Sequence, residues 1–190
     1  MRDTERVALE ARLELLTSQG EHARAAEEAI RGYGPELLGY LGALLRDDDR
    51  ARDVFQLVSE KLWKGLPTFQ RRCPVRNWAY QITWNTAQDH LKSSRRRREQ
   101  RLATTEAGRI ALEVRDGTRP HARTENRDRL AAARAALAPD EQTLLILRVD
   151  RGLAWEEVAE IMSATPAALR KRYERLRARL AQLLGVVDGG

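Results

Sequence analysis

Two short stretches of the sequence carry its excess positive charge, and each could contact the phosphates of a nucleic acid. Residues 92–101 hold six basic side chains against one glutamate, and residues 166–180 hold another six against one glutamate. Each stretch is therefore +5, whereas the whole chain of 190 residues is +6 and the remainder is net negative. Because the charge is concentrated in this way, we expect two phosphate-facing patches.

The residues that precede the first basic stretch combine aromatic rings with amide side chains. Rings can stack on unpaired bases and amides can hydrogen-bond to base edges, so the combination is typical of a surface for single-stranded nucleic acid. In so small a domain, Trp78 and Trp84 are also candidates for the hydrophobic core. The residues that form this combination are Asn77, Trp78, Tyr80, Trp84, Asn85 and Gln88.

The second basic stretch lies in a predicted helix that begins at Pro166, with Thr165 as its N-cap. A short helix over 155–162 and a turn of about three residues precede it, which is the sequence form of a helix-turn-helix. Arginines early in such a helix can grip guanine with two hydrogen bonds, and later ones meet phosphates. The candidate duplex-binding residues are Thr165, Ala167, Ala168, Arg170, Lys171 and Arg172, followed by Arg175, Arg177 and Arg179.

The elements that position these residues are predicted to be helices throughout. Steps of three and four between apolar residues recur, without sustained alternation of period two, so the expected fold class is all-α. Gly32, Gly34 and Pro35 predict a break between two helices, and the loss of periodicity over 94–125 predicts a linker. Helices are expected over about 4–19, 22–31, 35–45, 51–65, 75–93, 139–151, 155–162 and 166–184.

Composition argues against several other classes of protein. A single cysteine, Cys73, allows no intrachain disulfide, and three scattered histidines give no metal-ligand spacing, so we expect neither a metal nor a cofactor. No apolar run approaches the roughly 20 residues of a membrane span, and the N-terminus does not read as a secretory signal, which predicts a cytoplasmic protein. Paired carboxylates, an activated nucleophile and a phosphate loop are not recognisable in the sequence, so nothing in it indicates an enzyme.

Two blocks of the sequence resemble the sigma-70 family of bacterial RNA polymerase sigma factors, and specifically its extracytoplasmic-function group. The resemblance rests on residues 49–56, 62–63, 69, 76–82 and 85–91 in the first block, and on 137–142, 148, 152–159, 171–172 and 175–180 in the second. It implies a region 2-like domain over 31–94, a flexible linker over 95–126 and a region 4-like helix-turn-helix domain over 127–185. Residues 1–30 would form a helical extension of open role.

The resemblance also implies what each part binds. The first domain would dock on core RNA polymerase and would recognise and melt the minus-10 promoter element, and the second would read the minus-35 element. Family members are often held inactive by an anti-sigma factor, which is therefore a further candidate partner. The polymerase-binding residues would be Asp53, Gln56, Glu60 and Trp63. Those that contact the minus-10 strand would be Arg76, Asn77, Trp78, Tyr80, Gln81, Trp84, Asn85, Gln88 and Lys92.

The sequence departs from the family pattern at several positions. Arg52 and Leu57 stand where acidic residues are usual in the polymerase-docking helix, and Ser59 replaces an aromatic residue. Trp84 stands where the family often has arginine. Ala154 replaces the usual Ser or Thr N-cap, at a cost of about 1 kcal/mol in helix stability.

The free energies of base-pair separation and of base stacking indicate that the chain needs a partner to open DNA. Separating about a dozen base pairs costs roughly 15 kcal/mol, at about 1.4 kcal/mol per stacking step. Two or three bases stacked on rings return only about 1 to 3 kcal/mol each. Two alternatives remain open: a stand-alone helix-turn-helix regulator, and a helical adaptor or anti-sigma partner whose basic stretches are solvated helix faces.

Overall fold

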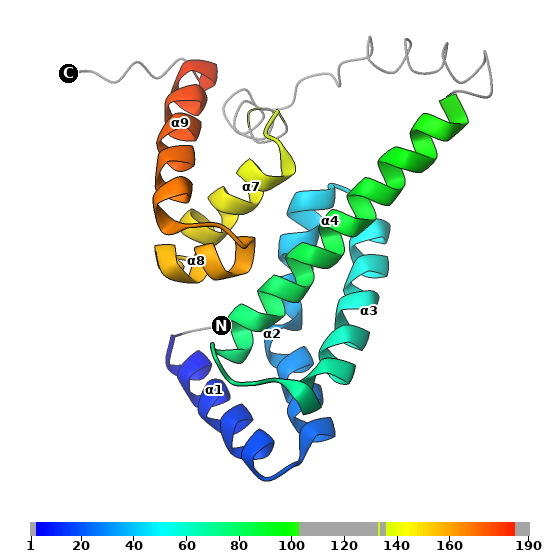
Figure 1. Cartoon of the computed structure of the whole chain (residues 1–190), viewed down its shortest axis with the longest axis vertical. Helices are drawn as coiled ribbons and strands as arrows, with labels where there is room; N and C mark the ends of the chain where they lie inside the picture. Colours follow the sequence, from blue (N-terminus) through cyan, green and yellow to red (C-terminus); the bar gives the residue numbers. More distant parts are fainter. Residues whose placement is uncertain (1–2, 103–132, 134–135, 185–190) are drawn as a thin grey trace.

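The computed structural model describes residues 3–102, 133 and 136–184, and all the regular elements in these ranges are helical (Figure 1). The all-α fold predicted from the sequence is confirmed. The elements are α1 (Asp3–Ser18), α2 (His22–Leu45), α3 (Asp48–Gly65), the 3₁₀ helix η1 (Leu66–Thr68), α4 (Val75–Leu102), α7 (Pro139–Leu145), the π-helical η2 (Ile146–Asp150), α8 (Trp155–Met162) and α9 (Pro166–Leu184).

Helices α1 to α4 form an N-terminal bundle, and α7 to α9 form a C-terminal unit (Figure 1). Within the described residues, one cluster of buried apolar side chains extends through both parts. Each buried leucine or valine contributes about 1.5 to 3 kcal/mol through removal of its surface from water. The most completely buried members include Leu37, Leu41, Val54, Val58 and Ala79 from the bundle and Leu144, Leu147, Ile161 and Leu169 from the C-terminal unit.

Helix α2 is continuous, so the break predicted at Gly32, Gly34 and Pro35 is wrong. The two glycines instead allow neighbouring helices to approach closely. A Cβ atom at Gly32 would collide with the Leu9 side chain of α1, and one at Gly34 would lie 3.1 Å from the Phe55 ring of α3. A proline inside a helix costs about 3 kcal/mol, so we infer that packing on both sides of Pro35 stabilises the helix through it.

Helix α4 continues through the arginine run to Leu102, beyond its predicted end near residue 93. Arginine is a strong helix former, and a helix that is polar on every face shows no apolar period from which its end could be predicted. The predicted linker therefore begins inside a helix. The remainder of that linker, residues 103–126, and the start of the second predicted domain over 127–132 lie outside the described residues.

The helix starts in the C-terminal unit follow a common pattern. The Ala154 N–H donates to the Glu157 carboxylate at 2.7 Å, and the Ala138 N–H donates to Glu141 at 3.0 Å. Each glutamate supplies half of a capping box, which partly replaces the missing Ser or Thr side chain. Thr165 caps α9 as predicted, since its hydroxyl accepts from the Ala168 N–H at 3.2 Å.

Candidate nucleic-acid interface

The predicted strand-binding residues of α4 divide between buried and exposed positions. Asn85 and Lys92 are exposed, and Trp78, Gln81 and Gln88 are half-buried. Trp78 packs against Phe69, with ring centroids 4.7 Å apart. The buried members are Arg76, Asn77, Tyr80 and Trp84.

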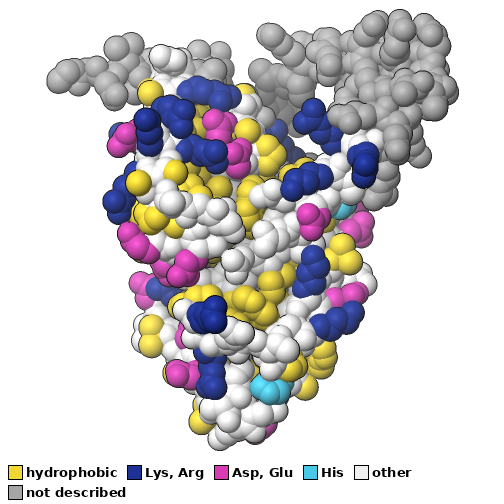
Figure 2. All heavy atoms as spheres, in the orientation of Figure 1, with side chains coloured by type: hydrophobic (Ala, Val, Ile, Leu, Met, Phe, Trp, Pro, Cys, Tyr) yellow, Lys and Arg dark blue, Asp and Glu magenta, His cyan; other side chains and the backbone are white. Residues whose placement is uncertain are grey.

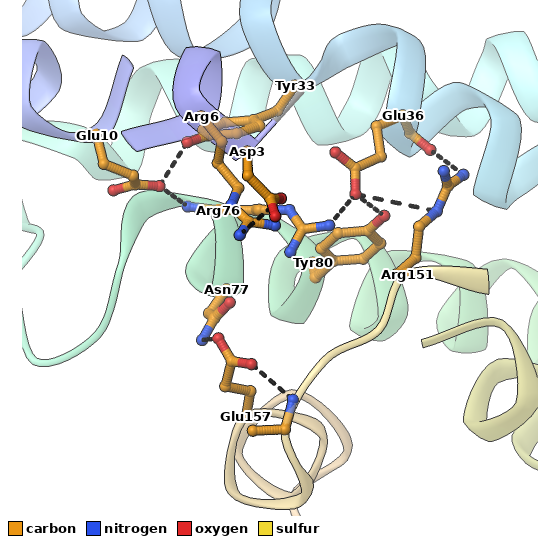
Figure 3. A network of polar contacts seen from close by, with 11 residues as sticks. Asp3, Arg6, Glu10, Tyr33, Glu36, Arg76, Asn77, Tyr80, Arg151 and Glu157 are labelled. Carbon is orange, nitrogen blue, oxygen red and sulfur yellow. Dashed lines mark hydrogen bonds and ion pairs between the residues drawn. The ribbon is translucent and has the colours of Figure 1, made fainter. Parts of the chain in front are cut away.

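Glu36 of α2 holds two of these buried residues in place (Figure 3). Its carboxylate accepts hydrogen bonds from the Arg76 guanidinium and, at 2.7 Å, from the Tyr80 hydroxyl. Arg151 of the C-terminal unit also reaches this point, because its Nη2 donates to the Glu36 backbone oxygen at 3.3 Å. Its Nε lies 3.9 Å from the Glu36 carboxylate. One acidic side chain is therefore shared by the bundle and the C-terminal unit.

The surroundings of Glu36 keep the carboxylate charged. Burial by itself raises the pKa of Glu36, but hydrogen bonds from Arg76 and Tyr80 outweigh it and, with the charges of Arg76 and Arg151, hold the pKa below its ordinary value of 4.5. Burial and the adjacent carboxylate raise the pKa of the Tyr80 phenol. Tyr80 therefore stays protonated at neutral pH and can donate to Glu36.

Two of the predicted strand-binding residues contact α8 directly. The Asn77 amide Nδ2 donates to the Glu157 carboxylate at 3.1 Å (Figure 3), and the Gln81 amide donates to the Glu160 backbone oxygen at 3.3 Å. These contacts form a seam between α4 and the C-terminal unit. Part of the predicted strand-binding face is thus covered by α8.

The seam continues between α2 and α7. The buried hydroxyls of Tyr40 and Thr143 are hydrogen-bonded at 2.9 Å, and the Gln142 amide donates to the Ala43 backbone oxygen at 2.6 Å. The Tyr40 ring also meets the Tyr80 ring edge to face, with centroids 5.8 Å apart. The C-terminal unit is therefore bound to two helices of the bundle.

A cavity of about 370 Å³ opens along the seam. The α4 side chains that line it include Trp84, Gln88 and Lys92. Arg172 of α9 lines the opposite side, so a predicted duplex-binding residue and predicted strand-binding residues face the same space.

The predicted duplex-binding residues of α9 are exposed, except for the half-buried Arg172. Figure 2 shows Lys and Arg side chains gathered over α9 and over the upper part of α4. Several guanidinium groups contact acidic groups of the same unit. Arg172 lies 2.7 Å from Asp140, and Arg179 lies 3.2 Å from Glu141. These ion pairs are partly exposed, so phosphates could compete for the arginines.

Trp155 holds one predicted base-reading residue. The Arg170 guanidinium lies 5.8 Å from the centre of its ring, and that of Arg148 lies 5.0 Å away. Arg170 also pairs with Glu156 at 3.3 Å. Cation–π contact and the ion pair together orient Arg170 before any ligand arrives. Sequence reasoning placed Trp155 only at the start of a helix and missed this role.

The four predicted polymerase-binding residues share one exposed face of α3. Asp53, Gln56, Glu60 and Trp63 follow steps of three and four, and all are exposed. The Trp63 side chain remains 49% exposed, and the neighbouring Leu57 remains 48% exposed. Figure 1 shows α3 and the C-terminal unit on opposite sides of α4, so the seam leaves this face uncovered.

The described ranges contain neither a candidate membrane-spanning helix nor a candidate metal-binding cluster. No helix there is long and apolar enough to cross a membrane. In the same ranges, His, Cys, Asp and Glu side chains do not gather in groups of three that could hold a metal ion.

A family model described as Sigma-70 region 2 matches residues 29–97, which run from α2 into α4. The proteins that match over most of the chain include two named RNA polymerase sigma factors from different bacteria. The RNA polymerase sigma-H factor of Pseudomonas aeruginosa is 29% identical over 160 residues, which covers 81% of this chain and 83% of that protein. RNA polymerase sigma factor YlaC of Bacillus subtilis is 25% identical over 161 residues, with coverage of 84% and 92%.

The solved structures that share the fold include two protein complexes. CnrH, in complex with the cytosolic domain of CnrY, matches with a TM-score of 0.65 at 20% identity, covering 93% of this chain and 97% of that one. Sigma factor RpoE, in complex with anti-sigma factor NepR from Bartonella quintana, matches with a TM-score of 0.61 at 21% identity. The second match covers 84% of this chain and 96% of RpoE.

Proposed function

The chain belongs to the sigma-70 family of RNA polymerase sigma factors, in its extracytoplasmic-function group, and we propose how its surfaces divide the work of promoter recognition. Its function is that of a sigma factor in transcription initiation. In our proposal α3 binds core RNA polymerase, α4 reads the separated minus-10 strand, and α9 reads the minus-35 duplex. The observation that carries this division is the presence, in one chain, of two features. Helix α4 holds Trp78 and the amides of Gln81, Asn85 and Gln88 at half-buried or exposed positions, and a basic helix-turn-helix ends in α9.

The exposed face of α3 supports the polymerase contact. Trp63 and Leu57 are large apolar side chains left open to solvent, beside the charged Asp53 and Glu60. Exposed apolar patches with a polar rim are typical of protein-binding sites, and tryptophan often dominates their affinity. Arg52, one of the two departures from the acidic family pattern, pairs with Asp49 at 2.9 Å. That pair reduces the effect of its positive charge on the docking face.

The seam implies a change of arrangement during function. Asn77 and Gln81 cannot meet a DNA strand while their amides bond to α8. We therefore propose that the C-terminal unit moves away from α4 when the chain binds polymerase and promoter. Each seam hydrogen bond contributes only about 0.5 to 1.5 kcal/mol, but separation also exposes apolar side chains of the core cluster that the two parts share. In this proposal, binding energy on the polymerase and the promoter offsets both costs.

The structural neighbours support one further partner. RpoE and CnrH were both solved with a bound protein, which for RpoE is an anti-sigma factor. We propose that an anti-sigma factor also binds this chain and holds it inactive. The chain would work in the cytoplasm, where polymerase and promoters are found, and it would act by binding, without catalytic chemistry of its own.

Transcription by a reconstituted holoenzyme tests the proposal. The full chain is mixed with core polymerase of its organism and a library of genomic promoter fragments, and transcript starts are sequenced. We expect starts at a defined set of promoters that core polymerase alone does not use. A chain that fails to bind core polymerase, or that yields no new start, would refute the function. Tight duplex binding without polymerase would instead favour a stand-alone regulator.

Variants of α9 in the same holoenzyme test the duplex contact through their promoter affinity at several salt concentrations. Arg175→Ala removes a predicted phosphate contact, so the logarithm of promoter affinity should fall less steeply with the logarithm of salt concentration, by about 0.9. Arg31→Ala removes an exposed arginine of α2, outside the helix-turn-helix, and should leave the slope unchanged. Equal slopes for all three proteins would exclude Arg175 as a phosphate contact.

A further inference from the structure

Helix α4 takes the acceptors for its first two N–H groups from another helix. The first N–H groups of any helix lack acceptors within the helix. Pro74, the residue before α4, has no side-chain acceptor, and the first intrahelical bond runs from the Trp78 N–H to the Pro74 carbonyl oxygen at 3.2 Å. The N–H groups of Val75 and Arg76 therefore need acceptors from elsewhere in the protein.

Glu10 of α1 supplies both acceptors (Figure 3). Its Oε2 accepts from the Val75 N–H at 2.9 Å, and its Oε1 accepts from the Arg76 N–H at 2.8 Å. A carboxylate at this position also interacts favourably with the positive end of the helix dipole. A residue 65 positions away along the chain thus performs the capping that a local Ser or Asp usually performs.

The Glu10 carboxylate is itself held in place. The Tyr33 hydroxyl of α2 donates to its Oε1 at 2.6 Å. Burial and this hydrogen bond raise the pKa of Tyr33, so the phenol keeps its proton. Leu13 and Leu16 anchor α1 in the core, and Leu9 packs against Gly32. Glu10 therefore has a fixed position relative to both α2 and the start of α4.

We propose that Glu10 is a positioning residue for the strand-reading face of α4. By fixing the backbone at Val75 and Arg76, it sets where the Arg76 and Tyr80 side chains meet Glu36. This inference rests on the proposed function of α4 and gives a role to the N-terminal extension, which lies outside the matched region 29–97. Loss of Glu10 should weaken strand binding selectively, because its hydrogen bonds join it to α2 and to the start of α4.

The test compares Glu10→Ala and Glu10→Gln with the matched control Glu14→Ala. Glu14 is an exposed glutamate on the same helix, so its removal changes the charge equally. Each full-length protein is assembled with core polymerase. Three affinities are measured: for core polymerase, for duplex minus-35 DNA, and for a forked probe with a single-stranded minus-10 segment. Both DNA probes are cut from the promoter that the parent holoenzyme transcribes best.

We expect Glu10→Ala to lower affinity for the forked probe about tenfold, as for loss of a helix cap, and to leave the other two affinities within about twofold. Glu10→Gln keeps one acceptor oxygen and should fall between Glu10→Ala and the parent. Amide hydrogen exchange at Val75 and Arg76 should accelerate in the same order. Glu14→Ala should match the parent in every measurement.

Other outcomes separate this inference from the proposed function. If the parent holoenzyme does not bind the forked probe, the function of α4 is wrong. If the parent binds and both Glu10 variants bind equally well, Glu10 does not position the strand-reading face. An equal loss of all three affinities in Glu10→Gln would show a general structural role and would also overturn the inference. Because Glu10→Gln is the milder change, it keeps the test decisive if Glu10→Ala does not fold.

Discussion

Asn77 of α4 donates a hydrogen bond to Glu157 of α8 across 3.1 Å, although the two residues are 80 positions apart in the sequence. The same Glu157 carboxylate accepts from the Ala154 N–H at 2.7 Å and so helps to start α8. A residue predicted to meet DNA is therefore bound to the helix-turn-helix unit, whose own predicted ligand is DNA. Occupation of both surfaces by one promoter requires this contact to break.

Weakening the seam should make the open arrangement more populated. Gln142→Ala removes the 2.6 Å hydrogen bond to the Ala43 backbone oxygen and should cost the closed arrangement about 1 kcal/mol. Small-angle X-ray scattering should then report a larger mean radius of gyration than for the parent. Gln70→Ala, at an exposed glutamine away from the seam, serves as the control. An unchanged radius in Gln142→Ala would mean that this bond does not hold the units together.

Glu36 should contribute more to stability than surface glutamates do. Glu36→Gln leaves the 8%-exposed Arg76 side chain without its carboxylate, and breaking a buried pair in this way costs about 3 to 5 kcal/mol. Glu27→Gln breaks the exposed pair with Arg31 and should cost less than about 1 kcal/mol. Urea unfolding at neutral pH measures both costs. Similar values for the two variants would contradict the importance assigned to Glu36.

The pH dependence of stability should reflect the same carboxylate. Because the pKa of Glu36 is lowered in the folded protein, its contribution is fully present above the ordinary value of 4.5 and is lost as pH falls through the folded pKa. The free energy of unfolding of the parent should therefore fall more steeply below about pH 4.5 than that of Glu36→Gln. Urea titrations from pH 7 to pH 3 check this. Parallel curves would show that Glu36 does not titrate differently on folding.

The α3 face should account for much of the affinity for polymerase. Trp63→Ala removes a half-exposed ring from the proposed docking surface and should weaken binding to core polymerase by about 2 kcal/mol or more. Val7→Ala, which trims a 65%-exposed apolar side chain on α1, should leave that affinity unchanged. Fluorescence titration of labelled protein with core polymerase measures both. A small effect of Trp63→Ala would show that the docking surface lies elsewhere on the protein.

Local pattern predicted the helices well and their tertiary relations poorly. The period of apolar residues located α1, α3, α8 and α9 within a few residues, and Thr165 was predicted correctly as a cap. Gly32 and Gly34 were predicted to break the helix because the sequence alone does not distinguish a glycine that permits close helix packing from a glycine that forms a turn. Only the positions of Leu9 and Phe55 distinguish the two.

The acidic residues behind the candidate site had no local signal. Glu36 meets Arg76 from 40 positions away, and Glu10 meets Val75 from 65. In the sequence each is one glutamate on an amphipathic helix, where the usual expectation is a solvated side chain. The predicted strand-binding residues were found by their side-chain chemistry, whereas the residues that orient them are defined only by the packing of α1 and α2 against α4.

Because α2 is continuous, one rigid helix contacts both the start of α4 and the C-terminal unit. Tyr33 touches the Glu10 cap, Glu36 holds Arg76 and Tyr80, and Tyr40 touches Thr143 of the C-terminal unit. These residues span two turns of one helix, or about 10 Å at 1.5 Å per residue. With a hinge at Pro35 the two contacts would move independently. Because α2 is unbroken, we expect a displacement at Tyr40 to reach the first turn of α4. Departure of the C-terminal unit would then shift the strand-reading face of α4 as well as uncover it.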